Sequence, residues 1–297
     1  ADWPALWEEL KSVVLFWMAA GVRTFRVDNP HTKPLAFWKW LIDEIREAAP
    51  DVIFLAEAFT RPKVMRYLAK AGFTQSYTYF TWRNHKWDLR EYAAELTQGP
   101  MKHYFRGNFF ANTPDILHEY LQKGGRPAFK IRAVLAATLS SIYGIYSGYE
   151  LCENAPLHEG SEEYLDSEKY QIRMRDWNAP GNIKDYIARI NRIRQLHPAL
   201  QQYANLSFYE SRNDNILCYG KKTLDNSDII VVVVNLNPHQ AHEDLVRLPI
   251  WEFGLQDWQT YQMHDLITGE KYHWKGCDNY VRLDPGYEPA HLFHLKK

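Results

Sequence analysis

The sequence predicts an α/β domain built on a parallel sheet, followed by an antiparallel β domain. Between residues 1 and 202, apolar runs of strand length alternate with amphipathic helical segments. Such βαβ repeats form parallel sheets with right-handed crossovers. Between residues 203 and 297, short strand-like runs are separated by Asn, Asp, Gly and Pro, which is typical of an antiparallel sandwich. We therefore predict one domain at 1–202 and a second at 203–297.

The first domain is expected to contain five strands. Its opening helix, residues 3–20, has apolar residues at helical spacing and ends at Gly21. The run 52–56 is apolar throughout, as in a strand that is buried on both faces. The strands are expected at 22–28, 52–56, 74–79, 104–111 and 142–147, and the later helices at 34–48, 62–71, 87–97, 115–122, 127–140 and 184–196. Five parallel strands form either an open doubly wound sheet or part of a barrel of eight.

The second domain is expected to consist of short strands, and a long polar segment precedes it. The segment 151–181 is longer than a simple connection requires, so we predict that it is a binding loop. The strands of the second domain are expected at 208–210, 216–220, 229–235, 244–248, 259–264 and 291–295.

Composition excludes several classes of function. The net charge of -1 and the dispersed basic residues provide no field for nucleic acid or an anionic membrane. No apolar run approaches the roughly 18 to 20 residues of a membrane span. The 3 cysteines are far apart, so neither a disulfide framework nor a zinc site is indicated, and a reducing cytoplasm fits best. Because the chain begins at Ala1 within a helix, we expect its natural N-terminus to be missing.

Three acidic residues follow predicted strands: Asp28, Glu57 and Asp115. Their spacings correspond to one and then two βα units, and the carboxyl ends of parallel strands share one edge, so they could converge on one ligand. Retaining glycoside chemistry uses two such carboxyl groups about 5 Å apart. Arg26 leaves the same strand face as Asp28 and is expected to keep it ionised, and apolar surroundings are expected to raise the pKa of Glu57. Alternatively, Arg26 and Asp28 only fasten a strand end, and the acidic residues cap helices or lie in solvated loops.

Four segments carry a resemblance to a known family. They resemble conserved regions of the α-amylase superfamily, glycoside hydrolase family 13: Arg26-Val27-Asp28, the segment 54–59, the segment 110–115, and the segment 144–150, which is similar to that superfamily's eighth strand. Within the superfamily, three segments are closer to the maltosyltransferases that use maltose 1-phosphate to extend α-1,4-glucans: 25–34, 54–62 and 72–84.

The resemblance implies a fold and a set of roles. The fold would be the C-terminal part, about five strands, of a (β/α)8 TIM barrel whose first three strands precede Ala1, followed by an antiparallel β-sandwich. Metal and organic cofactors would not be needed, the substrates would be maltose 1-phosphate and an α-1,4-glucan, and the intact parent would be a cytoplasmic homodimer. The implied site residues are Asp28 as nucleophile, Glu57 as general acid/base, Asp115 as the third carboxylate, Arg26 to orient Asp28, and Asn29, Lys169 and Tyr170 as donor contacts.

The match begins partway through the family's length, and this affects the expected activity. An unclosed barrel exposes two sheet edges, so we expect the intact parent to be active and this chain alone to be inactive and poorly stable. Two other functions stay open. One is a hydrolase or transglycosidase acting on α-glucans, and the other is a non-catalytic glucan-binding or scaffolding module. The segment Asn112-Thr113-Pro114-Asp115 also lacks the histidine that most of the superfamily carries before this aspartate.

Overall fold

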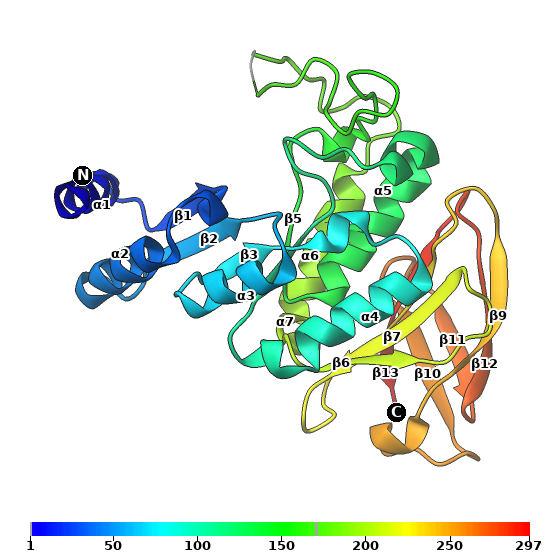
Figure 1. Ribbon diagram of the computed structural model, residues 1–297. Helices are drawn as coiled ribbons and strands as arrows, with labels where there is room; N and C mark the ends of the chain where they lie inside the picture. Colours follow the sequence, from blue (N-terminus) through cyan, green and yellow to red (C-terminus); the bar gives the residue numbers. More distant parts are fainter. Residues whose placement is uncertain (1, 170–171) are drawn as a thin grey trace. The chain divides into compact units, whose positions relative to one another are not determined.

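The computed structural model describes residues 2–169 and 172–297 (Figure 1). The chain forms two compact units. Unit 1 comprises residues 1–79 and 99–108, and unit 2 comprises residues 80–98 and 109–297. The boundary predicted between residues 202 and 203 therefore falls inside unit 2, and the division into domains at that point stays a prediction.

Unit 1 contains the first strands of the parallel sheet. β1 pairs with β2 and β2 with β3, all in parallel, as the alternation of strands and helices predicted. The ladder between β1 and β2 places Asp28 opposite Glu57. The elements are α1 (Trp3–Ala19), β1 (Thr24–Asp28), η1 (Pro30–Thr32), α2 (Leu35–Ala48), β2 (Ile53–Glu57), α3 (Pro62–Lys70), β3 (Gln75–Tyr77) and η3 (Pro100–His103).

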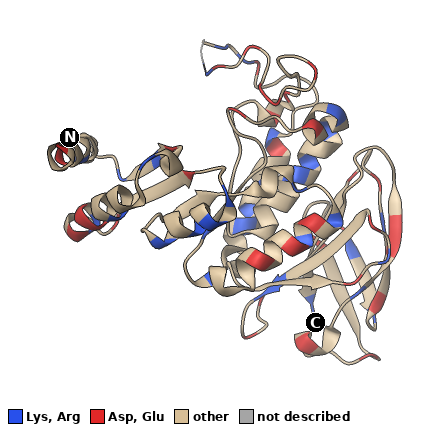
Figure 2. Cartoon of the chain, in the orientation of Figure 1, with Lys and Arg blue, Asp and Glu red and all other residues tan. Residues whose placement is uncertain are grey.

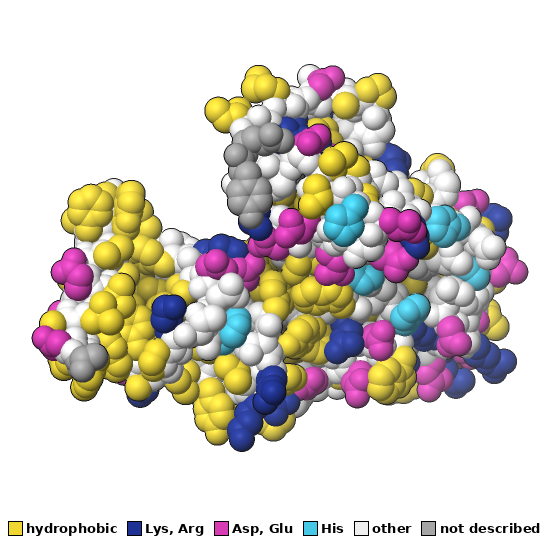
Figure 3. Space-filling model, turned by 45° about the horizontal axis from the view of Figure 1, so that its top comes forward, with side chains coloured by type: hydrophobic (Ala, Val, Ile, Leu, Met, Phe, Trp, Pro, Cys, Tyr) yellow, Lys and Arg dark blue, Asp and Glu magenta, His cyan; other side chains and the backbone are white. Residues whose placement is uncertain are grey.

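The core of unit 1 lies between α2 and β2. One face of α2 is buried, with Trp38 and Ile42 among its members, and it packs in one cluster with Phe54 and Ala56 of β2. The period of the apolar residues on α2 produces this face, because residues three and four apart lie on one side of a helix. The described helix α1 has no buried residue. Its exposed large apolar side chains belong to the hydrophobic surface on the left of Figure 3: Trp3, Leu6, Leu10, Val13, Leu15, Phe16 and Trp17.

Unit 2 contains the remaining helices and the last strand of the parallel sheet. β4 (Gly107–Phe110) continues from unit 1 into unit 2, and the strand order is β1-β2-β3-β4-β5. The predicted helices at 115–122 and 127–140 form one element with non-helical backbone angles at Gly125, two residues before Pro127. The further elements are η2 (Tyr79–Trp82), α4 (Lys86–Thr97), α5 (Glu119–Leu139), β5 (Ile142–Gly144), η4 (Tyr149–Leu151), α6 (Lys184–Leu196) and α7 (Pro198–Gln201).

Unit 2 also contains the antiparallel sheets. A six-stranded sheet has the order β11-β10-β13-β8-β7-β6, and β12 pairs with β9 in a second sheet. Every residue of β8 is buried, and its alternate valines belong to the main apolar cluster of the sandwich. Two of these strands, β11 and β12, were not predicted. The strands are β6 (Leu206–Tyr209), β7 (Ile216–Lys222), β8 (Ile229–Asn235), β9 (His242–Arg247), β10 (Thr260–Asp265), β11 (Lys271–Lys275), β12 (Asp278–Leu283) and β13 (Ala290–Lys296), with η5 (Ile250–Phe253) between β9 and β10.

Charged side chains of both signs are interspersed over the elements. Figure 2 shows acidic and basic residues together along α4 rather than separated by sign. Within the described part of the chain, no helix combines the length and the apolar composition that crossing a membrane requires.

Gly220 offers a test of packing in the sandwich. A Cβ atom at this position of β7 would lie 2.6 Å from the Tyr209 hydroxyl and 2.9 Å from the backbone oxygen of Ile230. Tyr209 is buried in the apolar cluster and has little room to move. We expect Gly220→Ala to lower the free energy of unfolding by about 1 to 3 kcal/mol in urea denaturation, because overpacking forces neighbours from their positions.

Gly286→Ala is the matched control. The nearest atom to a Cβ there is Asp284 Oδ1 at 3.2 Å, the end of a flexible side chain. The expected change is within about 0.5 kcal/mol. Equal effects of the two substitutions would contradict the packing argument.

Candidate active site

Asp28 and Glu57 end two neighbouring strands of unit 1. Asp28 is the last residue of β1, Glu57 is the last residue of β2, and the two are direct partners in the parallel ladder. Paired residues of adjacent strands project to the same side of a sheet. The two carboxyl groups accordingly lie within hydrogen-bonding reach of each other. The sequence predicted that these two side chains meet, although their chemical roles stay a prediction.

The two carboxyl groups differ in burial. Glu57 is 4% exposed and its neighbours Ala56 and Ala58 are fully buried, whereas Asp28 is exposed. Burial raises the pKa of Glu57, and the hydrogen bond with Asp28 raises it further, while the Arg26 guanidinium lowers it, so that the pKa of Glu57 lies at about 7. The predicted direction is confirmed. Glu57 can therefore exchange a proton near neutral pH.

Arg26 contacts Glu57, whereas the sequence led us to expect it to orient Asp28. Its Nη2 donates to Glu57 Oε2 in an ion pair. Its guanidinium carbon also lies 5.8 Å from the centre of the Tyr77 ring, and the Tyr77 hydroxyl is a further hydrogen-bond partner. Arg26 stands on β1, Glu57 on β2 and Tyr77 on β3, so the long side chain extends across the sheet. Tyr77 was not predicted as a site residue.

The loop after Asp28 is fixed by backbone contacts. Asn29 has a φ of 45° in the left-handed region, where asparagine is among the few side chains that are well tolerated. Its N–H donates to the backbone oxygen of Glu57 at 3.1 Å, which joins the ends of β1 and β2. The indole of Trp38 donates to the Pro30 oxygen at 2.7 Å, so α2 also holds this loop. A contact of Asn29 with a ligand stays a prediction.

Asp115 and Lys169 form an ion pair in unit 2. The Lys169 ammonium donates to Asp115 Oδ1, and the two side chains are 31% and 42% exposed. The backbone of Asp115 is held in a turn, because its N–H donates to Thr113 Oγ1 at 3.2 Å. Tyr170, the other predicted donor contact in this loop, lies outside the described residues. The Asp28–Glu57 pair belongs to unit 1, and the predicted roles of Asp115 and Lys169 stay predictions.

Asn112 is a structural residue of this loop that the sequence reasoning did not single out. Its side chain is fully buried. Its Oδ1 accepts the Tyr146 N–H at 2.8 Å, and its Nδ2 donates to the Tyr164 hydroxyl at 2.6 Å. It therefore joins the turn that carries Asp115 to the segment after β5 and to the long polar loop. The available signal in the sequence was an asparagine directly after the apolar run Phe109-Phe110-Ala111.

Arg175 anchors the long loop and was also missed. Its side chain is 5% exposed, and its guanidinium pairs with Glu153, with Nε 2.9 Å from Oε1, and with Glu168. Gly148 lies against the same group, since a Cβ there would be 2.1 Å from the Glu153 carboxylate. These partners are far apart in a polar stretch without periodicity, so the sequence offered no signal for them.

Solved structures identify the class of fold. The α-amylase of Geobacillus thermoleovorans is similar to 99% of this chain with a TM-score of 0.76 and 15% identity, and the match covers 64% of that structure. At this identity the similarity shows the fold alone. The chain has the fold of the α-amylases, with part of a TIM barrel followed by a C-terminal β domain, as predicted.

Comparison with curated sequences is more specific. An α-1,4-glucan:maltose-1-phosphate maltosyltransferase of Myxococcus xanthus is 55% identical over 301 residues, covering 100% of this chain and 45% of the relative. A second such enzyme, from Streptomyces coelicolor, is 56% identical over 100% of this chain and 44% of its own length. Residues 208–295 match the family described as "GLGE, C-terminal". The chain is thus a sequence relative of these maltosyltransferases and spans less than half of their length, which confirms the resemblance seen in the motifs.

The raised pKa of Glu57 predicts a pH-dependent difference in stability. The folded-state pKa of about 7 lies above the ordinary value of 4.5, so the folded state binds more protons between these values. The contribution of the Glu57 carboxyl group to the free energy of unfolding of wild type is fully present below pH 4.5 and is lost as the pH rises through 7. In Glu57→Gln, which does not titrate, the free energy of unfolding relative to wild type should rise by about 3 kcal/mol between pH 4 and pH 8.

Urea denaturation of both proteins at the two pH values measures this difference. Glu47→Gln, at an exposed position on α2, is the control. Its free energy of unfolding should differ from that of wild type by the same amount at both pH values. A difference for Glu57→Gln that does not change with pH would show that burial does not govern this carboxyl group.

Proposed function

We propose that Asp28 and Glu57 are the nucleophile and the general acid/base of an α-1,4-glucan:maltose-1-phosphate maltosyltransferase. The observation that carries the proposal is the pairing of an exposed carboxylate with a buried carboxyl group of pKa about 7 at adjacent strand ends. The names of the relatives supply the substrates, maltose 1-phosphate and an α-1,4-glucan. The maltosyl group would be transferred to the non-reducing end of the glucan with release of phosphate.

The reaction is a double displacement. The Asp28 carboxylate attacks the anomeric carbon of the donor while Glu57 gives its proton to the departing phosphate oxygen, and a covalent maltosyl-enzyme forms. The 4-hydroxyl of the glucan end then attacks the same carbon, Glu57 accepts its proton, and the bond to Asp28 breaks. Two inversions give net retention. A pKa near 7 suits Glu57 to both steps, since it must be protonated in the first and ionised in the second.

The remaining predicted residues have supporting roles in the proposal. Asp115 is the third carboxylate, which binds sugar hydroxyls. Lys169 is proposed to contact the donor with Tyr170 and Asn29, because an ammonium group suits a phosphate oxygen. Arg26 acts on Glu57 rather than on Asp28, since its positive charge keeps the pKa of Glu57 from rising further.

The proposal also covers the cellular compartment and the oligomeric state. Cys152, Cys218 and Cys277 are free thiols, which is usual in a reducing cytoplasm. A homodimer of the intact protein is proposed from the resemblance alone, and nucleic acid and membranes are not among the proposed partners.

A hydrolase or transglycosidase acting on α-glucans is the second candidate, because the fold is that of the α-amylases. Such an enzyme would use water or a sugar hydroxyl with maltooligosaccharides alone. Release of phosphate separates the two candidates, since only the maltosyltransferase produces it. A non-catalytic glucan-binding module would show neither reaction.

The experiment joins this chain to the part of the Myxococcus xanthus relative that the match leaves out, and compares the fusion with the chain alone. We expect the fusion to release phosphate from maltose 1-phosphate when maltohexaose is present, and the chain alone to release none. Asp28→Ala in the fusion should reduce the rate by at least about 10³-fold and abolish covalent labelling by a fluorinated maltosyl donor.

Asp43→Ala, an exposed position on α2, is the matched control and should retain both the rate and the label. Persistent labelling of Asp28→Ala would refute the assignment of Asp28 as the nucleophile. Cleavage of maltohexaose without maltose 1-phosphate, at a rate equal to that of transfer, would favour the second candidate.

A further inference from the structure

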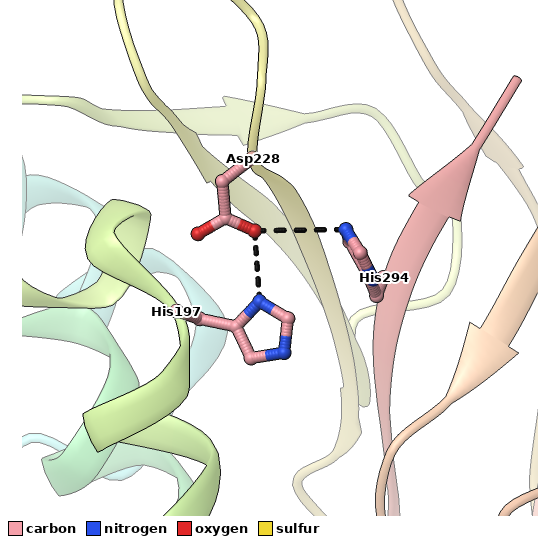
Figure 4. A group of neighbouring side chains, drawn as sticks. All are labelled: His197, Asp228 and His294. Atoms are coloured by element: carbon pink, nitrogen blue, oxygen red, sulfur yellow. Dashed lines mark hydrogen bonds and ion pairs between the residues drawn. The ribbon is translucent and has the colours of Figure 1, made fainter.

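Three side chains from separate elements of unit 2 meet around one carboxylate oxygen (Figure 4). His197 follows α6, Asp228 precedes β8, and His294 lies on β13. The Oδ1 atom of Asp228 lies 2.8 Å from His197 Nδ1 and 3.6 Å from His294 Nε2. Figure 4 shows one nitrogen of each imidazole ring directed at this oxygen.

The spacing of these atoms suits a single metal ion. The three ligand atoms all lie within 4.8 Å of one another. Zinc binds imidazole nitrogen and carboxylate oxygen at about 2.0 to 2.2 Å, which places neighbouring ligand atoms roughly 3 to 3.5 Å apart. The observed separations of 2.8 and 3.6 Å bracket that range. The two imidazole nitrogens lie within 4.8 Å of each other, so the rings would have to close by up to roughly 1 Å for all three atoms to bind one ion.

The surroundings hold the carboxylate in place and limit solvent. Asp228 is 9% exposed at its side chain, His197 13% and His294 23%, so the group is mostly desolvated but reachable from water. The second oxygen of Asp228 accepts the N–H of Ala199 at 2.9 Å. Such an outer contact orients a ligating carboxylate and leaves its other oxygen for the metal.

We propose that His197, Asp228 and His294 form a binding site for a divalent transition-metal ion of the zinc class. Two imidazoles and one carboxylate suit zinc in ligand type. The ion would connect the junction between α6 and α7 to β8 and β13, so its role is structural. The site shares no residue with the proposed catalytic residues and does not depend on their function.

Titration of the EDTA-treated chain with ZnCl₂ in a calorimeter tests the site. We expect saturable binding of one ion per chain, and at least 10-fold weaker binding in Asp228→Asn and in His294→Gln. Asp228→Asn retains an oxygen that can accept the Ala199 N–H, and His294→Gln retains size and polarity. His239→Ala, an exposed histidine in the same unit, is the control and should bind as wild type does.

Two further measurements separate loss of the site from loss of the fold. Thermal unfolding in EDTA should give similar Tm values for wild type and for at least one of the two variants, and ZnCl₂ should raise the Tm of wild type more than that of the variant. Binding of Co²⁺ should produce a visible d–d absorption band that is weaker in both variants. The proposal is overturned if wild type shows no stoichiometric binding, or if both variants bind as tightly as wild type.

Discussion

The chemistry of unit 1 depends on the register between β1 and β2. Asp28 and Glu57 meet because they are ladder partners, and a slip of one residue would turn one of them to the opposite face of the sheet. Two features fix this register. Phe54 and Ala56 are buried in the cluster that includes α2, and the N–H of Asn29 donates to the Glu57 oxygen. The packing of apolar side chains therefore decides where the carboxyl groups lie.

The same arrangement gives the two carboxyl groups different environments. Burial of Glu57 favours its neutral form, and the nearby Asp28 adds to this effect, while the charge of Arg26 opposes both. Had the guanidinium paired with Asp28 instead, Glu57 would lose this opposing charge and its pKa would rise further. The contact with Tyr77 holds Arg26 toward β2 and β3. The pKa of about 7 is thus a balance between burial of Glu57 on β2 and the charges of Asp28 and Arg26 on β1.

Much of the fold follows from the sequence, while the partners within the site depend on three-dimensional pairing. The apolar run before Glu57 and the apolar face of α2 are local signals, so their elements were predicted to within a few residues. β12 was missed although Asn279, Val281 and Leu283 alternate toward the interior, because the first of these inward residues is polar and only two apolar residues mark the strand. The spacing of Arg26 and Asp28 predicted a shared face. It could not reveal that Arg26 meets Glu57, since that contact depends on the neighbouring strand.

The ion pairs Arg26–Glu57 and Lys169–Asp115 differ in how far they are exposed to solvent. Glu57 is 6% exposed at its side chain, so loss of Arg26 would leave a buried acidic group without its cation. Asp115 and Lys169 are 42% and 31% exposed, and an ion pair at such exposure contributes about 0 to 1 kcal/mol. Under the proposed function, the donor phosphate would displace Asp115 from Lys169 at small cost, because a phosphate group carries more charge than a carboxylate. Arg26 would then keep a constant electrostatic environment at Glu57, while Lys169 would exchange one anion for another.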